Sequence, residues 1–229
     1  MYYALRITHY FVRKQEKLRI THSCAAPLCK RAKLESALRI KKNYALSITH
    51  YALFCTFAVA MNEVKIKNSV LEQAAHEGMD AFVGVFVKAI YDHIGGSLTL
   101  ETMSRLNADQ ITLLAWDILH QEVMDGGYVQ LIHNGYGPFI FKNPFAKAVR
   151  EWGLDDLCSH IHKANKLYNV HHEEIEQDCT DDEFMALFER MPKFDDLDDE
   201  FVDKEETWTA QIAHYVDDNI ENFADITKE

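Results

Sequence analysis

The sequence predicts an all-α fold: a single compact domain of about seven or eight helices over residues 61–229, behind an N-terminal leader. Hydrophobic residues make up 48% of the chain, enough for a sizeable core. After residue 61 they return every three or four positions, and Gly, Pro and capping residues separate the resulting segments. The run most typical of a strand, 136–141, contains Pro138, which disfavours a strand.

The leader, residues 1–60, differs from the rest of the chain in charge and pattern. It carries eleven Lys or Arg against two Asp or Glu, a net charge of +9, whereas residues 61–229 carry −21. Its heptapeptide Tyr-Ala-Leu-Arg-Ile-Thr-His recurs in part, and a tandem seven-base DNA repeat read in any frame encodes it. Solenoid repeats have periods of roughly 20–50 residues, so this one predicts no packed unit. We interpret the leader as repeat-derived, disordered or non-native sequence, and expect the native protein to begin at Met61.

A secretory signal is the alternative interpretation of the leader. The apolar run 53–60 follows a basic stretch and ends in a small-x-small pattern. The basic stretch is longer than that of a signal, so we expect a cytoplasmic protein and keep secretion as the alternative. Cys158 and Cys179, which lie in the domain, suit a reducing compartment better than a disulfide framework.

The first half of the domain is predicted to hold three helices before a bend. One begins at about residue 68 and runs to about His93, where a Gly-Gly pair ends it. Thr99 opens a short helix, and Asn107 with Gln110 forms a capping box for the next. That helix leads into a glycine-rich corner.

The corner, residues 119–143, holds four of the chain's nine glycines. A helix runs into Gly126-Gly127 and a second apolar segment follows at once. Because glycine adopts positive φ without steric cost, we predict a sharply bent helix-turn-helix at this position.

The second half of the domain is predicted to hold four helices. Asn143 and Pro144 begin the first, which ends near Trp152. A longer helix spans about 155–177. A Thr-x-x-Glu capping box begins a short helix that a proline ends, and the last helix spans about 205–223.

The corner sequence EVMDGGYVQLIHNGYG and the later MPKFDDLDDEFVD, together with the order of elements, resemble the bacterial DNA-mimic protein family over about residues 100–225. The family corner reads acidic-x-x-x-Gly-Gly-aromatic-x-Gln-aromatic-aromatic-x-Asn, followed by a Gly. Leu131 and Ile132 stand where two aromatics are usual. The matching residues are Glu122, Gly126, Gly127, Tyr128, Gln130, Asn134 and Gly137.

The resemblance implies a small acidic helical protein. The founding member presents carboxylates in place of DNA phosphates and occupies a DNA-binding protein as a dimer. For this chain it implies a basic DNA-binding partner such as a transcription factor, a role in transcription regulation, and a homodimer. The family assigns no carboxylate residue by residue, because the acids lie outside the matched corner.

The C-terminal part of the domain carries most of its negative charge. Residues 171–229 hold twenty-one Asp or Glu against four Lys or Arg. One acid in three helical residues gives one charge per about 4 Å, against one per about 1.7 Å of duplex DNA, so two acidic faces or a dimer are needed to imitate DNA. Such a surface attracts a basic protein and repels nucleic acid. No run reaches the roughly eighteen apolar residues of a membrane helix, so we expect no membrane interaction. We expect the partner-binding face at Asp195, Asp196, Asp198, Asp199, Glu200, Asp203, Glu205 and Glu206. The alternative is a run of charge that only keeps the protein soluble.

An enzyme or small-ligand-binding domain is the alternative function class. Gln130, His133 and Asn134, or His120 with Glu122, place polar groups near the corner. We expect these side chains to cap helices or bond to the backbone, and the chain lacks the nucleophile-elbow, phosphate-loop and dinucleotide motifs. The sequence predicts no catalytic residue and no cofactor.

A metal site is the best case for chemistry, because histidines and acids lie close together after residue 159. These residues are His160, His162, His171, His172, Glu173, Glu174 and Glu176. No two of the histidines have the His-x-x-x-His spacing of a zinc-binding helix, so we expect no metal.

Overall fold

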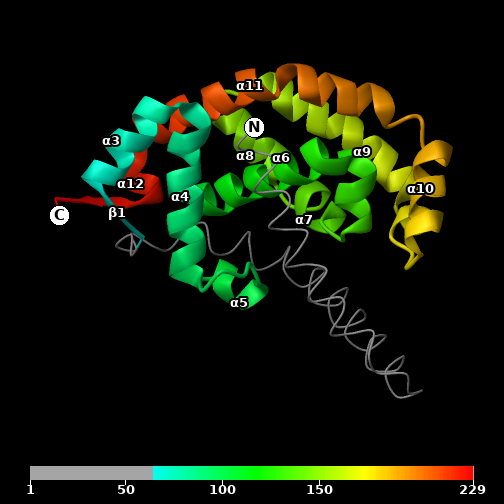
Figure 1. Ribbon diagram of the computed structural model, residues 1–229, viewed down its shortest axis with the longest axis horizontal. Coiled ribbons are helices and arrows are strands. Elements are labelled where there is room, and N and C mark those ends of the chain that lie inside the picture. The colour runs from blue at the N-terminus through cyan, green and yellow to red at the C-terminus, as the bar shows by residue number, and fades with distance from the viewer. Residues whose placement is uncertain (1–63, 229) are drawn as a thin grey trace, which may run out of the picture. The chain divides into compact units, whose positions relative to one another are not determined.

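The computed structural model describes residues 64–228, so the leader, the apolar run 53–60 and the expected start at Met61 lie outside the described residues. Within the described range the chain forms ten helices and two short strands, and the all-α prediction is confirmed (Figure 1). The elements are β1 (Lys65–Lys67), α3 (Asn68–Glu77), α4 (Met79–Ile94), α5 (Leu100–Met103), α6 (Ala108–His133), α7 (Gly137–Phe141), α8 (Phe145–Glu151), α9 (Asp155–Ile175), α10 (Asp181–Arg190), α11 (Asp195–Asp218), α12 (Ile220–Phe223) and β2 (Asp225–Thr227).

Helix α6 runs through the middle of this domain and contacts α4, α7, α8, α9, α11 and α12 (Figure 1). It begins at the predicted Asn107–Gln110 capping box, in which each side chain bonds to the other residue's backbone N–H. Leu113, Leu114 and Leu119 are fully buried in the hydrophobic core. The helix therefore serves as the support for the others.

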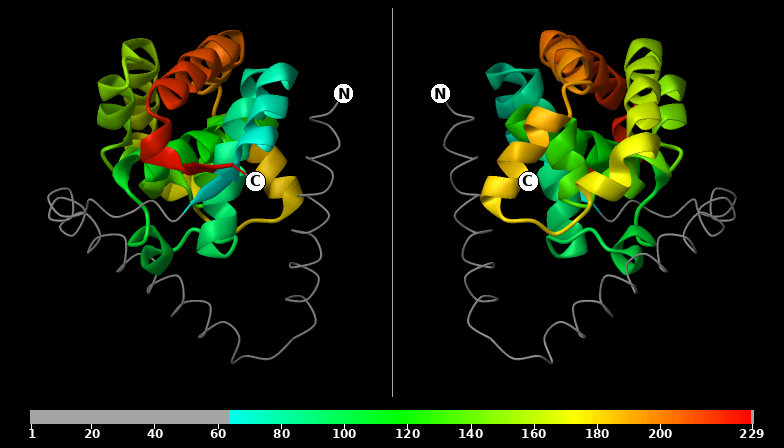
Figure 2. Two further views of the ribbon diagram at one scale, coloured as in Figure 1. Left: turned by 90° about the vertical axis from the view of Figure 1, so that its left-hand side faces the viewer. Right: turned by 90° about the vertical axis from the view of Figure 1, so that its right-hand side faces the viewer.

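Helix α11 lies between α9 on one side and the α3–α4 pair on the other (Figure 2). Its inner face carries Phe201 and Trp208, both almost completely buried. Phe201 stacks on Trp116 of α6, with ring centroids 6.0 Å apart. The first half of α11 is therefore held against α6, and its opposite face points to solvent.

Strands β1 and β2 pair in parallel, with Ile66 opposite Ile226, and so join the two ends of the described region. Nearby, the Gln110 side chain donates to the backbone carbonyl of Phe223 at 2.9 Å. Three-residue strands are too short to show an alternating pattern, so these two strands were not predicted from the sequence.

Two helix boundaries in the first two-thirds of the domain were predicted wrongly. The helix expected to run from about residue 68 to His93 is two helices, α3 and α4, because Gly78 adopts a φ of 130°. Asn143 does not cap α8: its side chain donates to the carbonyl of Phe139 at 3.0 Å, and Pro144 precedes the helix instead.

The last predicted helix, 205–223, also differs from the structure. Helix α11 begins ten residues earlier, at Asp195, and the end of the predicted span is the separate α12. The apolar spacing continues backward from Trp208 through Phe201 to Leu197, all buried. Acids in a first helical turn also interact favourably with the helix dipole. The whole acidic cluster is therefore helical, and the split at Gly78 and the short α7 and α12 raise the helix number above the expected seven or eight.

Candidate functional site

The glycine corner is a kink inside α6. Two helical arms meet there, and the backbone departs from helical geometry at Gly126 and Gly127. Gly127 has a φ of 69° and a ψ of −177°, a conformation that is essentially restricted to glycine. The predicted sharp bend between two helical arms is therefore present at these two residues.

A buried carboxylate joins the two arms of the kinked helix. Glu122, which is 6% exposed, lies before the kink. It accepts hydrogen bonds from Asn134 Nδ2 at 2.5 Å and Gln130 Nε2 at 3.4 Å, both from the arm beyond the kink. Gln130 Nε2 also donates to Asp125 at 2.7 Å. These bonds give a structural role to the acidic, Gln and Asn positions of the family corner pattern.

The acidic helix is attached to the kink through Asp198. The backbone N–H of Tyr128 donates to Asp198 Oδ1 at 2.8 Å, and a Cβ at position 127 would overlap the Asp198 carboxylate. Burial raises the pKa of Asp198 to about 6, with a smaller contribution from neighbouring acids of α11, against the lowering effect of the Tyr128 N–H. Gly127 thus provides both the bend and the space that this carboxylate occupies.

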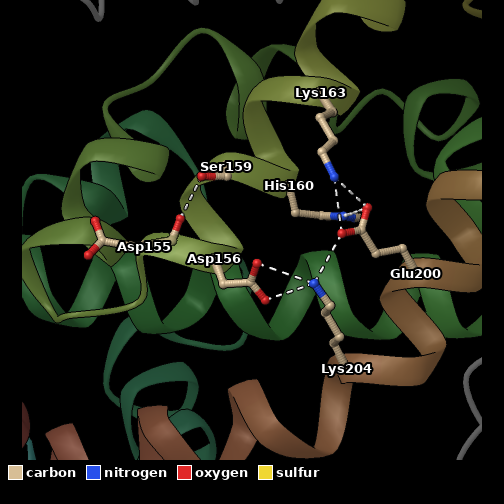
Figure 3. Close-up of polar contacts among 7 residues, drawn as sticks. All are labelled: Asp155, Asp156, Ser159, His160, Lys163, Glu200 and Lys204. Carbon is tan, nitrogen blue, oxygen red and sulfur yellow. Dashed lines mark hydrogen bonds and ion pairs between the residues drawn. The ribbon is translucent and has the colours of Figure 1, made fainter.

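Glu200 is held by cations of α9 and α11 (Figure 3). Lys163 Nζ lies 2.9 Å from its Oε2 and Lys204 Nζ 3.1 Å from its Oε1. Lys204 also pairs with Asp156 at 2.9 Å, which ties the start of α9 to α11. These bonds, with Lys163 the largest cause, lower the pKa of Glu200 to about 2.

Two histidines take part in the same internal contacts. His160 is buried, and its Nδ1 lies 3.2 Å from Glu200 Oε2. Burial lowers the pKa of His160, so the ring is neutral at pH 7 despite the nearby carboxylate. On the other side of α11, His120 Nε2 lies 2.9 Å from Glu205 Oε2, and both side chains are largely buried.

The eight acids of the expected binding face therefore fall into two groups. Asp198, Glu200 and Glu205 are internal anchors with bonds to α6 or α9. The other five are exposed, and none of them forms an ion pair within residues 64–228. We call them the acidic stripe: Asp195, Asp196, Asp199, Asp203 and Glu206. Asp195, Asp199, Asp203 and Glu206 follow one another at intervals of three or four residues on one face of α11, and Asp196 lies at the border of that face.

Comparison with known proteins identifies the family. A family model described as "DMP19-like protein" matches residues 104–219. The chain belongs to this family. A protein of Neisseria meningitidis serogroup B named "DNA mimic protein DMP19" is 35% identical over 127 residues, which cover 55% of this chain and 77% of that protein. The resemblance inferred from the corner sequence is confirmed, and the match begins just ahead of α6.

The remaining residues of the family corner are structural in this chain. Tyr128 is fully buried, and so are Leu131 and Ile132 at the positions where aromatics are usual. Gly137 begins α7 directly against the Tyr168 ring, which leaves no room for a Cβ. Leu131 and Ile132 can replace the usual aromatics because both positions face the core, where any large apolar side chain can fill the space.

The polar groups considered for chemistry are engaged within the domain. His133 Nδ1 lies 2.8 Å from the carbonyl of Ile175 and therefore donates to it, and the ring lies 4.5 Å from that of Phe184. Cys179 Sγ lies 4.0 Å from His133 Nε2, a contact between distant positions that the sequence did not indicate. Residues 64–228 contain no cluster of three or more His, Cys, Asp or Glu suited to a metal.

The partners of Glu200 were not predicted from the sequence. They are Lys163 and His160 of α9 and Lys204 of α11 itself, and only the Glu200–Lys204 pair has the i,i+4 spacing that a sequence reveals.

Within residues 64–228 the helices are too short or too polar to span a membrane.

Proposed function

We propose that this protein is a DNA mimic that occupies the nucleic-acid-binding surface of a basic protein, a transcription factor being the expected kind, and that it acts without catalysis. The observation that carries the proposal is the acidic stripe on a firmly attached helix. Its five carboxylates are exposed, whereas the acids on the neighbouring positions hold α11 in place. Membership of a family that contains a protein named as a DNA mimic supports the same function.

The spacing of the stripe supports imitation of one DNA strand. From Asp195 to Glu206 the helix rises about 17 Å, at about 1.5 Å per residue, so five carboxylates give one charge per about 4 Å. Phosphates follow one another at about 3.4 Å along the axis on each strand of a duplex. One stripe thus approaches the charge density of a single strand, and a homodimer would supply a second row.

The absence of catalysis is part of the proposal. The corner residues that an enzyme would need are engaged in contacts within the domain: Asn134 and Gln130 bond to Glu122, and His133 donates to a backbone carbonyl. These bonds support a structural role for the corner.

The test measures competition with DNA. The purified protein is immobilised, DNA-binding proteins from the native cytoplasm are captured at low salt, and duplex DNA is added as competitor. We expect at least one captured protein to be released by DNA and by high salt. The triple variant Asp199→Asn, Asp203→Asn, Glu206→Gln should lose this protein.

A second triple variant controls for net charge. Glu101, Asp217 and Asp218 are exposed acids outside the stripe, and Glu101→Gln, Asp217→Asn, Asp218→Asn removes the same charge. It should capture the partner as the parent protein does. If both triple variants weaken capture equally, net charge alone governs binding and the stripe is not the site.

A further inference from the structure

An exposed valine lies at the edge of the acidic stripe, about halfway along its length. Val202 is on the solvent face of α11 and is 53% exposed. The stripe residues one helical turn away on either side are Asp199 and Glu206, and Asp203 follows it directly. The solvent face of α11 therefore presents two methyl groups directly beside the exposed carboxylates.

Helix propensity does not favour a valine at this position. A residue that only solvates a helix is favoured when it is polar and unbranched, whereas valine exposes apolar surface and loses side-chain freedom in a helix. Val70 on α3 is the natural comparison, because it is 46% exposed but has Lys67, Gln73 and Ala74 one turn away. The two valines thus differ mainly in the charge around them.

DNA presents the same combination of groups to a protein. Rows of phosphates supply the charge, and the C5-methyl group of thymine supplies an apolar contact in the major groove. Proteins that read the groove meet that methyl with an apolar side chain placed near their phosphate-binding Arg and Lys.

We propose that Val202 takes the place of a thymine methyl group, so that the partner is a protein that reads the major groove and contacts Val202 with an apolar side chain beside its basic residues. This rests on the proposed DNA mimicry. It adds a source of specificity: the carboxylates attract basic surfaces in general, and the valine selects one with an apolar contact at the right place.

The two contributions respond differently to salt. Attraction between carboxylates and basic residues is screened and weakens as salt rises, whereas an apolar contact is not screened. Replacing Val202 by Thr keeps the shape and exchanges one methyl for a hydroxyl. We expect the dissociation constant of the complex with the partner to rise about fivefold to tenfold, because a buried methyl group is lost. The factor should be the same at low and at high salt.

The experiment compares four proteins: the parent, Val202→Thr, the control Val70→Thr, and the stripe variant Asp199→Asn, Asp203→Asn, Glu206→Gln. Dissociation constants are measured at about 50 and 200 mM salt. One probe is the purified partner that duplex DNA displaces from the parent, and the other is poly-L-lysine, which offers charge without an ordered apolar contact. Thermal unfolding checks that each variant is folded.

The inference is supported if Val202→Thr weakens partner binding by the same factor at both salts while poly-L-lysine binding and Val70→Thr are unchanged. It is overturned if Val202→Thr binds the partner as tightly as the parent while the stripe variant loses binding, because the carboxylates then act alone. If duplex DNA displaces no captured protein, or if the stripe variant binds the partner like the parent, the proposed mimicry itself is wrong. The proposed role of Val202 is then wrong as well.

Discussion

The two faces of the first half of α11 use the same residue types for opposite purposes. On the inner face Asp198, Glu200 and Glu205 contact a backbone N–H, two lysines and two histidines. On the outer face the acidic stripe remains exposed. A count of acids in the sequence therefore overestimates the charge available to a partner, and the inner acids determine how rigidly the outer ones are presented.

Gly127→Ala should have the largest effect, because it disturbs the place where the inner face is attached. Alanine is strained at a φ of 69° and ψ of −177°, and its Cβ would overlap the Asp198 carboxylate. We expect a loss of about 3 kcal/mol in the free energy of unfolding, measured by urea denaturation.

Gly84→Ala is the matched control for this variant. Gly84 lies inside α4, and apart from its chain neighbours and the helix's own backbone no atom lies within 4 Å of the position that an alanine Cβ would take. The substitution should raise stability by about 0.5–1 kcal/mol. A Gly127→Ala protein as stable as the parent would show that the kink does not depend on glycine.

Asp198→Asn should reveal the cost of a buried charge. The pKa of Asp198 is raised from 3.8 to about 6 in the folded protein, so the folded state binds the proton more tightly than the unfolded state. Its contribution to stability is complete below about pH 4 and is lost as pH rises through about 6. Asparagine can still accept the bond from Tyr128 and carries no charge.

The variant should therefore equal the parent in stability near pH 4 and exceed it by about 1–2 kcal/mol at pH 8. The measurement is urea denaturation of both proteins at several pH values. A difference that stays constant across this range would mean that Asp198 does not titrate there.

Glu200→Gln should show the opposite pH dependence with a smaller magnitude. Its pKa is lowered from 4.5 to about 2, so its stabilising contribution is present above about pH 4.5 and is lost as pH falls toward 2. After allowance for solvent screening we expect the variant to be about 1 kcal/mol less stable at pH 7. The difference should shrink on acidification to pH 3, and a difference that grows there would contradict the ion-pair network.

The sequence predicted the parts of this comparison that depend on local pattern. The capping boxes at Asn107 and Thr180 and the bend at Gly126 follow from residue types a few positions apart, and all are present. The division of the acids into two groups depends on contacts such as Tyr128 to Asp198, seventy residues apart, and Lys163 to Glu200. Sequence spacing carries no signal for such pairs.

Neutralising three of the five carboxylates of the acidic stripe should change the free energy of unfolding less than the substitutions on the inner face. Such a small effect would distinguish the outer face from the inner face most clearly. Asp199, Asp203 and Glu206 form no ion pair within the described residues, so Asp199→Asn, Asp203→Asn, Glu206→Gln removes repulsion and breaks no contact. We expect a change within about 0.5 kcal/mol, most favourable at low salt, by urea denaturation at two salt concentrations. If this variant were instead as unstable as Gly127→Ala, the outer acids would also be structural, and the distinction between anchors and stripe would not hold. A stable protein that has lost its partner would assign binding to the outer face alone.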